Sequence, residues 1–191
     1  MPLTLNLHPL LDLTQDQFAQ LCQHNRDLRL ERTAKGELIV MPPTGGDTGR
    51  RNTSLAGQLW NWNQRAKLGQ AFDSSTGFIL PNGATRSPDA AWVSQDRWAA
   101  LTPEQRRTFV PLCPDFAVEL RSPSDRRQEL QAKLQEYMEN GLRLGWLIDP
   151  ETQQVDVYRP DQNRQTLTCP QGLSGEPVLP GFILDLSDIL N

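Results

Sequence analysis

The pattern strand, helix, strand occurs in residues 115–148, which read DFAVELRSPSDRRQELQAKLQEYMENGLRLGWLI. Residues 114–120 are a short apolar run, which predicts a buried strand. Residues 126–140 have the apolar spacing of a helix, and Gly141 follows as the residue type that commonly ends helices. Because another apolar run begins at Leu144, the stretch predicts a right-handed βαβ crossover with two parallel strands in one sheet.

The segments before and after this crossover add further strands and helices. Residues 14–24 predict an amphipathic helix, because Thr14 and Gln17 match the capping box of a helix start. A mixed sheet flanked by helices is therefore expected. The other expected elements are a hairpin over residues 28–41, a mobile loop over 44–49, a long helix over 50–68, strands at 71–73, 78–80 and 89–93, a broken helix over 95–107, a hairpin over 154–169 and a C-terminal packing segment over 178–190.

Length and composition indicate a single domain. The chain has 191 residues, of which 37% are hydrophobic, so it can bury a substantial core. We expect an α/β (α+β) domain in which residues 1–27 form a helical segment that packs on a core formed by residues 28–191. No run of about 18 apolar residues occurs and the N-terminus lacks the pattern of a secretory signal, which predicts a cytoplasmic protein with no membrane span.

The cysteines and histidines argue against several kinds of site. Cys22, Cys113 and Cys169 are odd in number and widely spaced, which indicates reduced thiols and neither a disulfide framework nor a zinc site. His8 and His24 both precede the first predicted strand, so a histidine-based hydrolase is disfavoured. A metal would therefore need oxygen ligands, which favour Mg²⁺ or Mn²⁺.

Two carboxylates stand in apolar runs that predict strands. Asp89 precedes the run at residues 90–93, and Glu119 lies inside the run at 114–120. A strand end or a solvated face explains either residue alone, whereas a metal site explains both together. A hard cation held by Asp89 and Glu119 would stabilise the charge that develops when water attacks a phosphodiester. The carbonyl of Leu120 could add a third ligand.

Lys133 is expected to return to the height of Glu119. The strand can continue about 10 Å past Glu119, and a helix that starts at Asp125 falls back about 12 Å by Lys133. The lysine could then orient or deprotonate the attacking water, or neutralise the phosphate; the alternative is an exposed helical lysine. The helix is expected to turn Leu130, Leu134 and Met138 toward the sheet, with Lys133 beside this stripe and Glu129 and Glu136 on other sides.

Net charge and local charge point in different directions for nucleic-acid binding. The net charge is −4, whereas affinity for phosphates normally rests on lysine and arginine. Residues 48–71, around the predicted long helix, contain four basic residues and no acid. This segment is interpreted as a phosphate-binding surface, a solvated helix or a dimer contact. Candidate phosphate contacts are Arg50, Arg51, Arg121, Arg126 and Arg127.

Several of these motifs, taken in order, resemble one family. They are Ser87-Pro88-Asp89, the run at 114–120 followed by Ser122-Pro123-Ser124, Lys133 on its helix, and residues 146–150, which read WLIDP. This ordered set is similar to the Uma family of restriction-endonuclease-like proteins, within the PD-(D/E)XK nuclease superfamily. The resemblance covers most of the chain.

The resemblance implies roles for the candidate residues. It implies a PD-(D/E)XK nuclease fold, with Asp89 and Glu119 as metal ligands and Lys133 as the catalytic lysine moved onto the helix. Glu31 matches an acidic position in the early strands and would assist the metal. The usual motif has its lysine two residues after the acid, where this chain has Arg121. Because arginine cannot act as a general base near neutral pH, Lys133 must substitute.

Three hypotheses follow for the function. The leading one is a DNA endonuclease that uses Mg²⁺ or Mn²⁺ and forms a homodimer, because cleavage of both strands asks for two matched sites. The alternative is a catalytically inactive nuclease-fold module that binds nucleic acid or a protein partner, which the net charge and Arg121 favour. The third is a nonenzymatic oligomeric scaffold, although a buried aromatic core explains the same residues equally well: Trp60, Trp62, Trp92 and Trp98.

Overall fold

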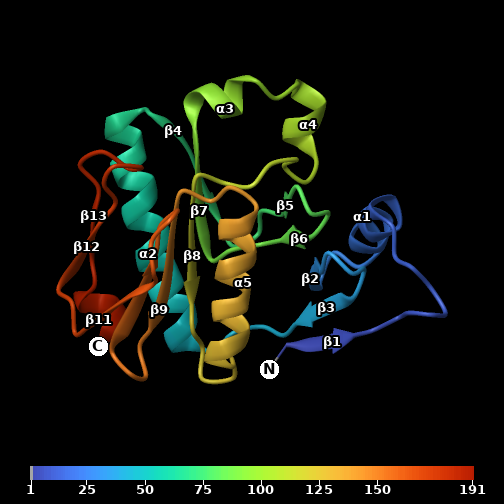
Figure 1. The fold of residues 1–191 in the computed structure, drawn as a ribbon, viewed down its shortest axis with the longest axis horizontal. Helices are drawn as coiled ribbons and strands as arrows, with labels where there is room; N and C mark the ends of the chain where they lie inside the picture. The colour runs from blue at the N-terminus through green and yellow to red at the C-terminus, as the bar shows by residue number, and fades with distance from the viewer. Residues whose placement is uncertain (1) are drawn as a thin grey trace.

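A six-stranded mixed sheet forms the centre of the computed structural model, which describes residues 2–191 (Figure 1). In sheet order its strands are β11 (Gln165–Thr168), β10 (Gln154–Tyr158), β9 (Leu144–Asp149), β8 (Phe116–Leu120), β7 (Ala90–Ser94) and β4 (Gly69–Asp73). β8 and β9 are parallel and all other neighbours are antiparallel. The mixed sheet and the parallel pair confirm the expected fold class and the strand, helix, strand unit.

Helices cover both faces of this sheet, because side chains alternate along each strand. Trp92 of β7 lies in the core with residues of α2 (Gly46–Ala66), and its neighbour Ala91 lies in the core with residues of α5 (Arg127–Glu139). The C-terminal segment packs on the α2 side, as expected for a packing segment. It consists of β12 (Gly172–Ser174), β13 (Ile183–Asp185) and α6 (Ser187–Leu190).

A second sheet of five strands lies on the far side of α5 from β9 in Figure 1. In sheet order its strands are β1 (Leu3–Leu5), β3 (Leu38–Met41), β2 (Arg29–Arg32), β6 (Thr85–Arg86) and β5 (Phe78–Ile79). α1 (Gln15–His24) begins with the predicted Thr14 capping box and packs Phe18 on the β2–β3 hairpin. This sheet therefore ties the first part of the chain to the segment just before β7.

The remaining helices are short. α3 (Gln95–Ala99) and α4 (Pro103–Arg107) connect β7 to β8, which confirms the predicted broken helix. Proline at the first position of α4 fits, because that position needs no N–H donor. Within the described residues, no helix has the length and apolar character needed to cross a membrane.

The predicted mobile loop over residues 44–49 is wrong from residue 46 onward. α2 begins at Gly46, and Gly45 takes the N-cap position. Thr48 in the first helical turn is only 5% exposed, so packing holds this glycine-rich segment in the helix despite its low helix propensity. β1 and β6 were not predicted, because runs of two or three residues carry no periodic signal.

Candidate functional site

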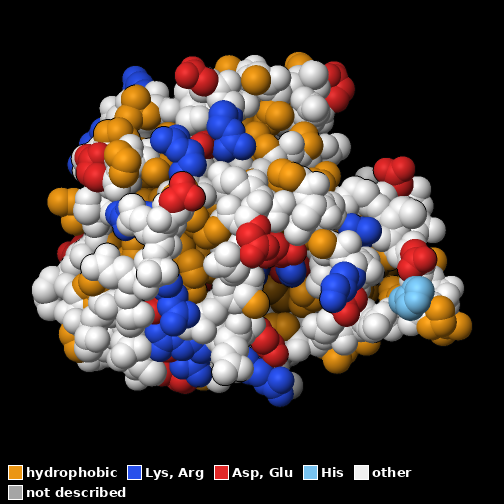
Figure 2. Space-filling model, in the orientation of Figure 1, with side chains coloured by type: hydrophobic (Ala, Val, Ile, Leu, Met, Phe, Trp, Pro, Cys, Tyr) orange, Lys and Arg blue, Asp and Glu red, His pale blue; other side chains and the backbone are white. Residues whose placement is uncertain are grey.

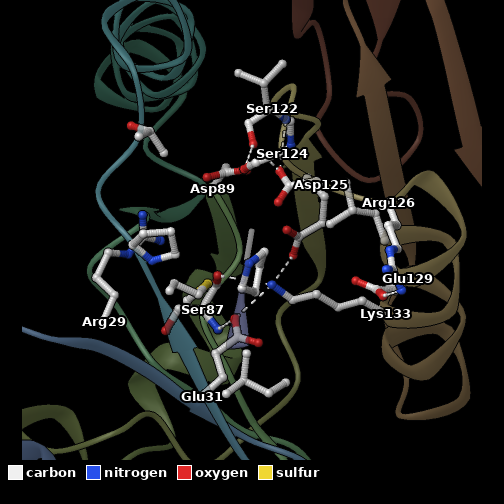
Figure 3. A pocket seen from close by; sticks show the side chains of 18 of the residues that line it. Arg29, Glu31, Ser87, Asp89, Ser122, Ser124, Asp125, Arg126, Glu129 and Lys133 are labelled. Carbon is white, nitrogen blue, oxygen red and sulfur yellow. Dashed lines mark hydrogen bonds and ion pairs between the residues drawn. The ribbon is translucent and has the colours of Figure 1, made fainter. Parts of the chain in front are cut away.

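A cavity of about 920 Å³ lies between the second sheet and α5, and Figure 2 shows it as a hollow with hydrophobic side chains inside and charged ones around it. Seven of the ten predicted site residues line this cavity: Glu31, Arg51, Asp89, Glu119, Leu120, Arg126 and Lys133. Glu31 comes from β2, Asp89 from the segment before β7, Glu119 from β8 and Lys133 from α5. The fold thus brings together residues that are far apart in the chain (Figure 3).

Asp89 is held by the backbone of the neighbouring strand. Its N–H donates to the carbonyl of Val118 (3.0 Å), and its Oδ2 accepts from the N–H of Leu120 (2.8 Å). The side chain of Asn52, in the first half of α2, donates to Oδ1 (3.1 Å). The carboxylate is therefore fixed beside Glu119, which lies between Val118 and Leu120 in β8.

Lys133 lies between two acidic side chains. Its Nζ is 2.8 Å from Glu31 Oε1 and 2.9 Å from Glu119 Oε1, and the carbonyl of Ser87 is 3.4 Å away. The lysine side chain is 12% exposed, and those of Glu31 and Glu119 are 3% and 4% exposed. The three groups form a buried charged cluster with one cation between two carboxylates, as Figure 3 shows for Lys133 and Glu31.

The electrostatics of the cluster differ from one carboxylate to the next. Burial raises the pKa of Glu119 to about 8, with Asp89 and Glu31 adding to the rise and Lys133 opposing it. Burial also raises the pKa of Asp89, although the Leu120 N–H opposes this. Burial lowers the pKa of Lys133, but Glu119 and Glu31 outweigh it, so the net pKa is raised and the amine stays protonated.

Glu31 is the most fully bonded acid in the cavity. Oε1 accepts from the Ser87 N–H (2.9 Å) and from Lys133, and Oε2 accepts from Arg86 Nη1 (3.2 Å). Burial works to raise its pKa, but Lys133 and Arg86 hold the pKa of Glu31 below its usual range. A metal would have to compete with three hydrogen-bond donors for the Glu31 carboxylate. Glu31 is therefore better placed to hold Lys133 than to bind a metal.

The donor set near Asp89 and Glu119 suits a hard divalent cation. Glu119 Oε1 is buried and accepts no well-directed hydrogen bond, even though Lys133 is nearby. Two buried carboxylates with raised pKa values need positive charge to remain ionised together. No group of three His, Cys, Asp or Glu side chains among residues 2–191 is arranged to hold a metal by itself. Mg²⁺ is typically bound by one or two carboxylates, with water and substrate phosphate as its other ligands.

The candidate arginines divide into two groups. Arg51 and Arg126 line the cavity, the latter 3.4 Å from Glu129. The other three do not line it and are bonded to other protein groups. Arg50 donates to carbonyls of Asp188 and Asn191, Arg121 pairs with Asp149 and Glu151, and Arg127 pairs with Asp156 and donates to Gln154.

Four further residues at the site were not predicted or were expected elsewhere: Arg86, Asn52, Glu129 and Glu136. Arg86 bridges Glu31 and Glu136, at 3.2 and 2.6 Å, and its position just before the Ser-Pro-Asp motif was the only available signal. Asn52 holds Asp89 and had no signal of this kind. Glu129 and Glu136 were expected on other sides of the helix, but both line the cavity. Residues three and four positions from Lys133 necessarily share its helix face.

Comparisons with known proteins identify the family of the chain and a solved structure of similar fold. The Uma2 family model, described as "Putative restriction endonuclease", matches residues 15–187. A solved structure from Anabaena variabilis, described as a putative nuclease belonging to DUF820, is 21% identical with a TM-score of 0.70. The alignment covers 84% of this chain and 89% of that one. A search of curated proteins finds no match. The chain belongs to the Uma2 family, and the expected resemblance is confirmed.

Proposed function

From its family and the geometry of the cavity, we propose that the protein is a metal-dependent DNA endonuclease. Asp89 and Glu119 would hold Mg²⁺ or Mn²⁺, with the carbonyl of Leu120 as a further ligand. The observation that carries the proposal is the contact of Lys133 with Glu119, 2.9 Å apart, in the cavity that Asp89 also lines. A cation and paired carboxylates at one buried position are the groups that phosphodiester hydrolysis uses.

The protonation state of Lys133 excludes one of its possible roles, that of a general base. Since the two carboxylates raise its pKa, the amine is an ammonium group near neutral pH and cannot accept a proton from water. We assign it the binding of a nonbridging phosphate oxygen and the orientation of the attacking water. Glu31 is then a positioning residue, which holds Lys133 Nζ at 2.8 Å.

The reaction is hydrolysis of one phosphodiester. Water adds to phosphorus, the bond from phosphorus to the leaving ester oxygen breaks, and that oxygen takes up a proton. When bound, the metal supplies positive charge for the developing negative charge and lowers the pKa of water. Asp89, fixed by Leu120 and Asn52, presents its carboxylate without further rearrangement. Arg51 and Arg126 are the candidate phosphate contacts that line the same cavity.

A cleavage assay with matched variants tests the proposal. Labelled DNA is incubated with Mg²⁺ or Mn²⁺ and wild-type protein, Asp89→Ala, Lys133→Met or the control Asp188→Ala, whose side chain is exposed on α6. We expect metal-dependent cleavage by wild type and the control, and a loss of about 10²-fold or more in the two site variants. Equal cleavage by all four proteins would remove this site from the reaction.

A second candidate function is a catalytically inactive module that binds nucleic acid or a protein partner. It is favoured by Arg121, which takes the usual lysine position and is paired with Asp149 and Glu151. Metal binding at Asp89 without cleavage of any DNA would support this alternative. A homodimer is required only where both strands are cut, and the oligomeric state stays a prediction.

A further inference from the structure

The cavity contains an apolar shelf that no core residue covers. Ile39 and Met41 share one face of β3, while Val40 between them packs with the core around Phe18 on the other face. Ile39 and Met41 line the cavity, are half-buried, and belong to none of the hydrophobic cores of residues 2–191. Their apolar surface is therefore available to a ligand.

The shelf adjoins the charged cluster on both walls of the cavity. Ile39 is the cross-strand partner of Glu31, and such partners share a face with Cβ atoms about 5 Å apart. On the helix wall, Leu130 lies one turn before Lys133 and also lines the cavity. A ligand with a charged group at Lys133 would thus lay a neighbouring apolar part against Ile39 and Leu130.

The size and depth of the site limit what can enter. About 920 Å³ is within the range of roughly 300–1,000 Å³ that is usual for pockets that enclose a small ligand. The Glu119 side chain is 4% exposed, so a phosphate has to enter the cavity to approach it. A duplex keeps each phosphate on a wide, stiff rod, whereas a single strand can bend one nucleotide into a pocket.

The charge of the residues that line the cavity also disfavours a duplex. Eight of the lining residues are acidic and six are basic. Three of the basic ones, Lys133, Arg86 and Arg126, are already paired with acids. Duplex-binding surfaces are strongly positive, because they neutralise a row of phosphates. This lining suits one phosphate accompanied by a metal.

We propose that the substrate is an unpaired DNA strand, with a base next to the scissile phosphate held between the shelf formed by Ile39 and Met41 and the side chain of Leu130. This inference rests on the proposed nuclease function and adds its substrate class. An unpaired base offers an apolar face to such a shelf, whereas a base in a duplex must first be unstacked and unpaired. Cleavage of duplex DNA is slower for that reason.

Substrates of one sequence in three forms test this inference. The same labelled oligonucleotide is offered with Mn²⁺ as a single strand, as a perfect duplex and as a duplex with an unpaired bubble. We expect the single strand and the bubble to be cut at least about 10-fold faster than the perfect duplex. The cuts in the bubble substrate should lie at its unpaired positions. Cleavage of the duplex at an equal or higher rate overturns the inference.

A variant of the shelf gives a second readout. Ile39→Ser should raise KM for the single strand about 10-fold and leave kcat nearly unchanged, because a base contact is lost while the charged cluster remains. The control is Ile183→Ser, an isoleucine of β13 that is 70% exposed and does not line the cavity. An unchanged KM for Ile39→Ser overturns the assignment of the shelf.

Binding separates this inference from the nuclease function itself. If no form of DNA is cut, the nuclease proposal fails. Fluorescence anisotropy with labelled single strand and duplex, in Ca²⁺, still tests which form the cavity takes. Tighter binding of the single strand that Ile39→Ser weakens supports the shelf. Equal or tighter binding of duplex, or no binding to either form, overturns it.

Discussion

Burial raises the pKa of Glu119, whereas the two neighbouring carboxylates keep Lys133 protonated, as it is in water. The pKa of Glu119 is raised to about 8, so its neutral form persists near neutral pH, while Lys133 stays charged. The sequence predicted that Lys133 lies at the height of Glu119. It did not predict the contact of Glu31 with Lys133, because that contact depends on the placement of β2 beside α5.

Replacement of Glu119 should change how stability depends on pH. An acid whose folded pKa is raised keeps its proton in the folded state when the unfolded state has lost it, so stability falls as pH rises from 4.5 to about 8. Glu119→Gln, measured without metal, should therefore be more stable than wild type at pH 8 by roughly 1–3 kcal/mol, with little difference at pH 4.5. Urea unfolding at both pH values checks this. A variant that is less stable at pH 8 would contradict it.

Glu31→Gln should destabilise the protein and impair the site. The change removes the negative charge that faces Lys133 and Arg86, both of which are largely buried. Loss of one partner of a buried ion pair costs about 3 kcal/mol or more. Thermal and urea unfolding measure this, with Glu129→Gln as a control because that side chain is 58% exposed. Equal stability of the two variants would show that Glu31 does not anchor the cluster.

At the level of elements, the start of α5 is clamped to the sheet on the side away from the cavity. Asp156 of β10 is fully buried and accepts from Arg127 (3.0 Å), Gln131 (2.9 Å) and Thr166 (2.7 Å). Arg127 and Gln131 belong to the same helix as Lys133. These contacts therefore fix the position from which the helix presents Lys133, although they involve neither Asp89 nor Glu119.

Asp156→Ala should thus act at a distance from the cavity. It removes the buried carboxylate that lies closest to Arg127, at 3.0 Å, and we expect a loss of about 3 kcal/mol in the free energy of unfolding. At temperatures where the variant is folded, kcat for DNA cleavage should fall while metal affinity changes little, because Asp89 and Glu119 are on other elements. Unchanged stability, or a loss of metal binding with kcat intact, would contradict this role.

For the whole molecule, the sequence predicts what is periodic and local better than what is paired over long distances. The β8–α5–β9 unit could be predicted, because its signals lie within 34 consecutive residues, about the usual size of such a unit. The five-stranded sheet could not, since β2 pairs with β6 through Arg32 and Thr85 alone. That sheet supplies Glu31 and the apolar shelf, so the sequence predicted the β2–β3 hairpin but not its position in the wall of the cavity. Domain boundaries and the homodimer stay predictions.

Titration of Mn²⁺ into the protein by calorimetry tests most directly whether this molecule holds a metal at the proposed site. It is done with wild type, Asp89→Ala and the control Asp188→Ala, each with and without uncleaved DNA. We predict binding by wild type and the control that is lost in Asp89→Ala. Binding that persists unchanged in Asp89→Ala, or no binding by wild type even with DNA present, would contradict the account.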